Sequence, residues 1–310
     1  MRLDVCLQNE LQTPRNQVEQ LIKKHGIFVN SKKIFKTGLK LKGGESIEFI
    51  LPIMQKSIPQ DIDFDVEIIY EDEDLLIINK PPKLIVHPAK SVKEPTLVDW
   101  LKHKGISLST LSAEERHGIV HRIDKETSGA LVVAKNNETH TALSKQLEDK
   151  SMGRYYLSLI DTPLKENIII DKPIGRDPNN RIKMAINKNG KDAKSAFIKL
   201  ALAKDNSKEL ISIKLFTGRT HQIRVHLNSI SRHIINDFTY GFKSKKDKLQ
   251  RVMLHAYLIY FIHPKSGELI IKKAPLFEDF KSILKQQFNT KDIDEKLNQD
   301  YIINSFTTDF

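Results

Sequence analysis

The chain has 310 residues, of which 39% are hydrophobic and 29% are charged, and its formal net charge is +11. No apolar run approaches the roughly 18 residues that a membrane-spanning helix needs, and the N-terminal residues MRLDVCLQNELQ lack the apolar core of a signal peptide. We therefore expect a cytoplasmic protein with about two domains. Its single cysteine, Cys6, excludes an intramolecular disulfide and a multi-cysteine zinc site. The positive charge is typical of proteins that bind nucleic acid, although a solvated, lysine-rich surface would give the same charge.

Residues 1–52 are predicted to form a small separate module. Within them, residues 15–25 carry apolar side chains at helical spacing, which predicts an amphipathic helix. Residues 27–29 and 47–51 alternate apolar and polar side chains, as strands do. The two strand patterns are separated by a lysine-rich loop with the sequence SKKIFKTGLKLKGGE.

The predicted helix and the strand that follows it resemble a known RNA-binding module. The segment PRNQVEQLIKKHGIFVNSKK is similar to the alpha-L motif of a small-subunit ribosomal protein and of several RNA-modifying enzymes, with Ser31 where that motif usually has glycine. The alternative is a helix and a hairpin whose lysines are only solvated. The resemblance implies that the module binds RNA, and the basic residues that we expect to contact it are Arg15, Lys23, Lys24, Lys32 and Lys33.

The rest of the chain is predicted to form the main domain, preceded by a short linker. Residues 53–62 contain a proline and show no hydrophobic period, which is typical of an interdomain linker. Residues 63–290 contain many strand patterns with helices interspersed. Because strand and helix do not alternate regularly, we predict an α+β domain with a mixed, largely antiparallel sheet flanked by helices. Residues 291–310 become acidic and polar, and we expect a peripheral helix or a frayed tail without a chemical role.

Strands of the main domain are predicted from apolar runs, beginning with a hairpin that ends at Pro81 and Pro82. The strand patterns are VEIIYEDEDLLIINK, ALVVAK, RYYLSLI, AFIKLAL, LISIKLF, VMLHAYLIYF and ELIIKK. Helix patterns cover residues 137–149, 220–231 and 276–286.

The segment RHGIVHRIDKETSGALVVAKN, residues 116–136, is the most informative for function. It concentrates histidine, arginine, aspartate and hydroxyl side chains on a turn that leads into an apolar strand, and such a loop is positioned by the strand. Ser128 beside Gly129 is a candidate nucleophile, but the G-x-S-x-G motif is absent. Asp124 is a candidate catalytic carboxylate, and the alternative is an aspartate that only caps the turn.

The same segment resembles the catalytic signature of a known enzyme family. The string HRIDKETSGALVVAK is similar to H-R-L-D-x-x-T-S-G-L-L-V-A-K of the RluA-type pseudouridine synthases. Further matches follow in the family's order, and they read NKPPKLIVHP, RYYLSLI, TGRTHQIRVHL and MLHAYLIYFIHPKSGE. Lys83 and Asn236 depart from the family, since each stands where the family has glycine.

The resemblance implies an enzyme that isomerises uridine in RNA to pseudouridine, without a metal or cofactor. It further implies that Asp124 is the catalytic carboxylate, Tyr156 the active-site tyrosine, and Arg224 the arginine that pairs with Asp124. The carboxylate either attacks the anomeric carbon or removes a sugar proton, and both roles require its ionised form, which an arginine within about 4 Å favours. We expect Arg224 on the helix predicted at 220–231, beside its inward apolar stripe.

Further residues are expected to bind the substrate. A uridine in folded RNA must be extruded, and the resemblance implies that Arg122 accompanies base flipping. Tyr156 is expected to stack on the uracil, with Tyr155 on the opposite strand face. Leu254 is expected to line the uracil pocket. The remaining candidates are His121 and Arg219, of which Arg219 is expected to bind a phosphate or to anchor its turn.

Two rival interpretations remain. Six of the 11 histidines suggest a metal site, and they are His87, His121, His221, His226, His255 and His263. The motif H-E-x-x-H is absent, however, and the spacing of His221 and His226 separates them on a helix, so local hydrogen bonds are expected instead. A non-catalytic RNA-binding or ribosome-assembly protein would also explain the charge, but it would not need Asp124, Tyr156 and Arg224 together. Large-subunit ribosomal RNA is the expected substrate and transfer RNA the alternative. We expect a monomer that contacts neither membrane nor metal.

Overall fold

The computed structural model describes residues 1–11, 15–48, 62–88, 92–111, 116–180, 182–243 and 251–308. Residues 49–52 of the predicted N-terminal module and residues 53–61 of the predicted linker lie outside these ranges. Among the described residues, no helix is long and apolar enough to cross a bilayer.

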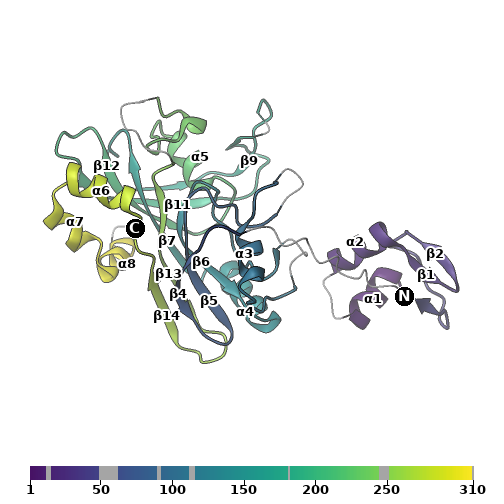
Figure 1. Cartoon of the computed structure of the whole chain (residues 1–310). Helices are drawn as coiled ribbons and strands as arrows, with labels where there is room; N and C mark the ends of the chain where they lie inside the picture. Colours follow the sequence, from purple (N-terminus) through teal and green to yellow (C-terminus); the bar gives the residue numbers. More distant parts are fainter. Residues whose placement is uncertain are drawn as a thin grey trace.

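The N-terminal residues form a small unit with its own apolar core, drawn in purple in Figure 1. Its sheet has the strand order β2-β1-β3. Its buried core residues are Leu3, Leu7, Val18, Ile22, Ile27 and Val29. Its elements are α1 (Leu3–Leu11), α2 (Arg15–His25), β1 (Ile27–Val29), β2 (Lys32–Ile34) and β3 (Ile47–Glu48).

A tight turn in this unit corrects the prediction of one long lysine-rich loop. Asn30 and Ser31 have φ angles of 49° and 63°, so the chain reverses within two residues, as hairpin turns of this kind require. Phe28 then pairs with Lys33, and the beginning of the expected loop becomes strand β2. Ser31 thus adopts the left-handed conformation that explains why the resembled motif usually has glycine there.

The main unit is built on one nine-stranded sheet, with the strand order β4-β5-β6-β13-β7-β12-β11-β8 and with β14 paired to β13. The pairing of β13 with β6 is parallel, and the other pairs in this sheet are antiparallel. The predicted α+β class with a mixed, largely antiparallel sheet is therefore confirmed. The strands are β4 (Glu67–Glu71), β5 (Leu75–Lys80), β6 (Ser128–Ala134), β7 (Gly153–Ile160), β8 (Ile168–Asp171), β11 (Lys194–Leu202), β12 (Glu209–Leu215), β13 (Leu254–Ile262) and β14 (Leu269–Lys273).

Helices cover both faces of this sheet, and a hairpin of β9 (Ile174–Arg176) and β10 (Met184–Ile186) lies beside it. Along β5, Leu75 and Ile77 pack in one core with Leu143 of α4, whereas Leu76 and Ile78 pack in another with Trp100 of α3. Because both faces are buried, β5 is a continuous apolar run. The helices are α3 (Leu97–His103), α4 (Asn137–Glu148), α5 (Gln222–Asn228), the short helix η2 (Phe238–Tyr240), α6 (Glu278–Gln287), α7 (Thr290–Lys296) and α8 (Gln299–Thr308).

The C-terminal residues belong to the main core, which differs from the expectation of a peripheral helix or a frayed tail. They form α7 and α8, whose residues Ile293, Ile302 and Phe306 are buried in the larger core cluster. The rings of Phe306 and Tyr155 lie 5.3 Å apart, so α8 packs directly against β7. Ile62, which was assigned to the linker, also packs against this core. A few apolar residues decide this packing in a segment that is polar on average.

Helix α5 is shorter than the predicted helix 220–231. It begins after His221, whose φ of 56° is left-handed, and it ends at Asn228. The Oε1 atom of Gln222 accepts a hydrogen bond from the backbone N–H of Arg219 at 2.9 Å, which closes the turn before the helix. Ile230 therefore lies outside the helix. The prediction extended too far because the apolar spacing continues into these turns.

Candidate active site

The loop that carries Asp124 is held at its end by a buried hydrogen-bond network. Ser128, the first residue of β6, is fully buried, and its hydroxyl lies 2.8 Å from Nδ1 of His255. The same hydroxyl accepts a hydrogen bond from Nη1 of Arg251 at 2.9 Å, and Arg251 is bound in turn by Asp279 through two hydrogen bonds of 2.6 and 2.8 Å. Ser128 is thus an anchor rather than a nucleophile.

Gly129 explains the close approach of this loop to strand β13. Its φ is 111°, and a Cβ atom added there would lie 2.2 Å from the carbonyl oxygen of Ala256. A larger residue would therefore push β6 away from β13, where the two strands run parallel. Gly129, the last residue of the T-S-G sequence after Asp124, thus allows the Asp124 loop to pack closely against β13.

Lys80 also anchors the Asp124 loop, although it was not predicted from the sequence. Its side chain is fully buried, and its ammonium donates hydrogen bonds to the carbonyl oxygens of Pro81, Leu84 and Lys125 at 2.7, 2.8 and 3.2 Å. Burial lowers the pKa of Lys80 to about 7, against the opposing influence of the Asp124 charge. Lys80 ties the turn after β5 to the residue that follows Asp124.

Arg224 lies between two carboxylates. It donates two hydrogen bonds to Asp237, from Nε at 2.7 Å and from Nη2 at 2.8 Å, and its Nη1 lies 3.4 Å from Oδ2 of Asp124. Burial lowers the pKa of Arg224, but the hydrogen bonds and charge of Asp237, assisted by Asp124, raise it by more. Asp237 holds the guanidinium, so that its remaining nitrogen can face Asp124.

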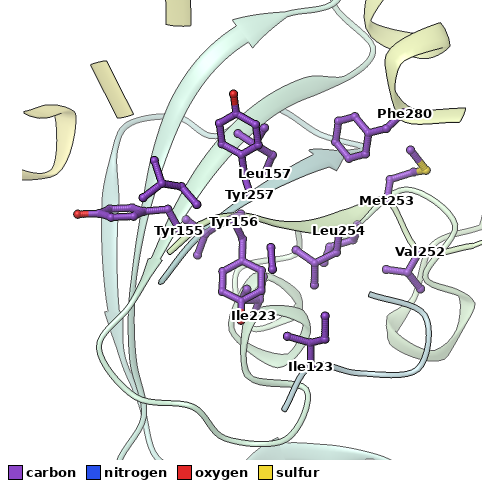
Figure 2. Packing of buried hydrophobic residues seen from close by; sticks show 14 of the residues in the cluster. Ile123, Tyr155, Tyr156, Leu157, Ile223, Val252, Met253, Leu254, Tyr257 and Phe280 are labelled. Carbon is purple, nitrogen blue, oxygen red and sulfur yellow. The ribbon is translucent and has the colours of Figure 1, made fainter. Parts of the chain in front are cut away.

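Tyr156 forms one wall of the pocket into which Asp124 points. Figure 2 shows its ring beside Ile123, Ile223 and Leu254, whereas Tyr155 points away from them, as the strand alternation predicts. The cavity has a volume of about 80 Å³ and is lined by Asp124, Tyr156, Arg224 and Leu254 together with residues of the 218–223 turn. Burial raises the pKa of Tyr156, so its phenol stays protonated at neutral pH.

The other expected substrate-binding residues take different positions. Arg122 is exposed, lines the same pocket, and its Nη2 lies 3.5 Å from the hydroxyl of Thr220. Arg219 also lines the pocket, and its Nε donates to the carbonyl of Asp192 at 2.8 Å. His121 does not line this pocket. It is buried, and its Nε2 accepts a hydrogen bond from the backbone N–H of Val132 at 3.1 Å, which makes it a support of β6.

The basic residues expected to contact RNA in the N-terminal unit are only partly described. The side chains of Arg15 and Lys24 lie outside the described atoms. Lys23 and Lys32 are exposed, with Lys23 3.9 Å from Glu19. Lys33 is also exposed, and its ammonium lies over the ring of Phe35.

Histidines of the described chain are engaged mainly in local hydrogen bonds. Nδ1 of His221 lies 2.8 Å from the hydroxyl of Tyr240, and His226 contacts the hydroxyl of Ser195 at 3.0 Å. Within the described ranges, Asp72, Asp74 and His263 alone lie close enough together to hold a metal ion, and none of them lines the Asp124 pocket.

Comparison with known proteins identifies the family. The RNA pseudouridylate synthase family matches residues 74–229. An RNA pseudouridine synthase of Helicobacter pylori, described as uncharacterized, is 49% identical over 98% of this chain and 95% of its own length. The chain belongs to the RNA pseudouridine synthase family. Ribosomal large subunit pseudouridine synthase D of Nitrosomonas europaea is 36% identical over 92% of this chain and 83% of its own length. The solved structure of human RNA pseudouridylate synthase domain containing 1 has the same fold, with a TM-score of 0.59 at 23% identity over 75% of this chain and 94% of its own.

The predicted enzyme class is thereby confirmed, and this pseudouridine synthase is an isomerase that acts on RNA. The rival interpretation of a non-catalytic RNA-binding protein is not needed to explain its charge. Both departures from the family's motifs lie at left-handed positions, with φ angles of 67° at Lys83 and 68° at Asn236, which explains why the family usually has glycine there. Glycine adopts this left-handed conformation without strain, asparagine tolerates it well, and lysine adopts it at some cost.

Asp237 is the functional residue that sequence reasoning missed most clearly. It follows Asn236 in the turn that was noted only for its missing glycine, and it lies 13 residues after Arg224. Its carboxylate is 1% exposed and holds Arg224 through both oxygens. The local signal is an aspartate that directly follows a glycine-type turn, but this signal does not say which arginine the aspartate binds.

Asp237→Asn should unfold more easily and react more slowly, because it leaves the Arg224 guanidinium without its bidentate carboxylate. Breaking such a buried pair costs about 3–5 kcal/mol of unfolding free energy, and loss of a charged hydrogen bond predicts a fall in kcat of about 10- to 100-fold. Urea unfolding and single-turnover kinetics measure the two effects. Asp171→Asn is the control, since Asp171 is 63% exposed and 3.8 Å from Lys194. Equal activity of the two variants would contradict this role of Asp237.

Lys80 predicts a pH dependence of stability. Its pKa is about 7 in the folded protein and 10.5 when unperturbed. Between these values the unfolded chain binds more protons, so the contribution of Lys80 to stability rises with pH in this window, by at most about 1.4 kcal/mol per pH unit. The difference in unfolding free energy between the wild type and Lys80→Met should therefore grow from pH 7 to pH 10 in urea titrations. Lys199→Met, at a partly exposed lysine, should show no such trend. Parallel pH profiles for the wild type and Lys80→Met would refute the assignment.

Proposed function

We propose that this enzyme modifies specific uridines in large-subunit ribosomal RNA, by base flipping and by cleavage and re-formation of the glycosidic bond with Asp124. The observation that carries the catalytic assignment is the pocket in which Asp124 lies 3.4 Å from Arg224 and beside Tyr156 and Leu254. The choice of ribosomal RNA is supported by relatives that are named for the large ribosomal subunit, at 36–39% identity.

Asp124 would act in its ionised form. Its side chain is 18% exposed toward the pocket, and the positive charge of Arg224 stabilises the carboxylate. The carboxylate either attacks C1′ of the ribose and displaces the base, or removes a proton from C2′ so that the base leaves a glycal. The detached uracil anion then turns and C5 bonds to C1′, which breaks the Asp124 ester bond in the first route, whereas in the second route the proton taken by Asp124 returns to C2′. C5 loses its proton and N1 gains one, so that the reaction is an isomerisation without net oxidation or reduction.

The other pocket residues would hold the base while it turns. The ring of Tyr156 offers a stacking surface, which contributes roughly 1–3 kcal/mol per base. Leu254 and Ile223 provide apolar contact on the remaining sides. Arg122 is exposed at the mouth of the pocket, where its guanidinium can fill the space that the flipped uridine leaves in the RNA.

We assign RNA binding outside the pocket to residues 1–52. Residues 53–62 would form a linker, and residues 63–290 would form the catalytic domain. The N-terminal unit has a core cluster that shares no residue with the clusters of the main unit. Tethering a second RNA-binding unit raises the local concentration of RNA at the catalytic domain. We also expect the enzyme to act as a monomer in the cytoplasm.

Mapping of pseudouridines tests the function directly. Cells that lack the protein should lose pseudouridine at particular positions of large-subunit ribosomal RNA. Wild-type protein should restore these positions and Asp124→Asn should not, because the amide cannot act as the ionised carboxylate. Loss of pseudouridine only in transfer RNA would refute the ribosomal target, and restoration by Asp124→Asn would refute the catalytic assignment.

Deletion of residues 1–52 should weaken binding to the mapped RNA more than it slows the bound reaction. The tethered unit supplies affinity, whereas the pocket residues belong to the main unit. RNA affinity at fixed ionic strength and single-turnover rates at saturating enzyme separate the two effects. Equal affinity of the full-length and shortened proteins would exclude a tethering role.

A further inference from the structure

Arg154 is a buried cation without a partner among the described residues. Only 9% of the residue is exposed, and no hydrogen bond or ion pair within the described chain reaches its guanidinium, whose Nε is buried and unpaired. Burial lowers its pKa, with the nearby Tyr156 opposing this. A buried charge without a counter-charge destabilises a protein, so such a group calls for an explanation.

The other buried arginines of the described chain are fully paired. Arg224 is held by both oxygens of Asp237, and Arg251 is held by both oxygens of Asp279. The fold therefore supplies a bidentate carboxylate where a guanidinium has a structural task. Arg154 differs, because no carboxylate among the described residues binds its guanidinium.

Arg154 lies beside the reaction centre. It precedes Tyr156 by two residues on β7, so both side chains leave the strand on the same face. It lines the Asp124 pocket and also a neighbouring hollow of about 540 Å³. The basic residues that line this hollow with it outnumber the acidic residues Glu148 and Asp192, and they are Arg122, Lys150 and Arg219. The hollow next to the pocket thus favours an anion.

Gly218 keeps space free for this guanidinium. A Cβ atom added at Gly218 would lie 2.8 Å from Nη1 of Arg154 and 3.3 Å from Nη2. The backbone of Gly218 is not left-handed, so its conformation does not require glycine. The absent side chain therefore leaves room at the end of Arg154, and Gly218 itself lines both hollows.

We infer that Arg154 binds a backbone phosphate of the RNA strand that carries the target uridine. Two parallel N–H groups of a guanidinium match two phosphate oxygens. When the ribose of the target lies at Asp124, the phosphates on either side of it are the RNA anions nearest to the wall that Arg154 forms. The inference requires only that the substrate is RNA, as the family shows, and it does not depend on which RNA is modified.

The melting temperature of the free enzyme distinguishes phosphate binding by Arg154 from a structural role. Arg154→Met should raise the melting temperature of the free enzyme by about 2–4 °C, because an unbranched apolar side chain replaces an unpaired buried charge. The same variant should lower kcat/KM on RNA by about 10- to 100-fold, the range expected for a charged hydrogen bond. Lys214→Met is the control on the neighbouring strand, where Lys214 lies over the ring of Tyr155 and lines neither hollow. A lowered melting temperature of Arg154→Met would overturn the inference.

RNAs in which single phosphates are replaced by uncharged analogues test whether Arg154 binds a phosphate. In a short RNA around a mapped target uridine, each flanking phosphate is replaced in turn by an uncharged methylphosphonate. At one position the replacement should cost the wild type about 10- to 100-fold in kcat/KM and should cost Arg154→Met nothing further. If every replacement impairs both enzymes equally, Arg154 contacts the base or sugar instead and the phosphate assignment is wrong. Activity of the wild type on the unmodified RNA shows separately whether the target has been chosen correctly.

Discussion

A guanidinium can support an ionised carboxylate only if it is fixed in place and keeps a nitrogen free for it. In this enzyme Asp237 meets both conditions, because it binds Nε and Nη2 of Arg224 and leaves Nη1 facing Asp124 at 3.4 Å. The pair of Arg224 and Asp237 is buried, so water competes little with its hydrogen bonds. The arrangement of helix α5, the η2 turn and the Asp124 loop around the pocket depends on this contact, which joins segments that are 100 residues apart.

The Asp124 loop is rigid for related reasons. Lys80 holds it through the carbonyl of Lys125, and Ser128 closes it against His255 and Arg251. Gly129 allows β6 to approach β13. Because these contacts are buried or partly buried, they hold the carboxylate in place before RNA arrives, and a site held in this way loses little energy to rearrangement during the reaction.

The buried arginines of the described chain therefore fall into two groups. Arg224 and Arg251 have carboxylates that the chain itself supplies, and their positions are set by the protein. Arg154 has no such partner among the described residues, although it is buried beside Tyr156. Stability that is given up at a functional site is a common cost of binding a charged substrate. We therefore attribute the unpaired charge of Arg154 to RNA binding, whereas the paired charges of Arg224 and Arg251 are held in place by the protein itself.

The resemblance to a known family was sufficient for the enzyme class. Local patterns were sufficient for the mixed sheet and for the orientation of Tyr156 relative to Tyr155, because strand alternation is a property of neighbouring residues. They were not sufficient for the ends of α5, where left-handed turns override the apolar spacing, or for the packing of Phe306 into the core. The partner of Arg224, the anchoring by Lys80 and the lack of a partner at Arg154 were decided only by the tertiary structure. Each depends on which charged groups distant segments bring together in a buried place, and burial and long-range distance are not encoded in any local pattern.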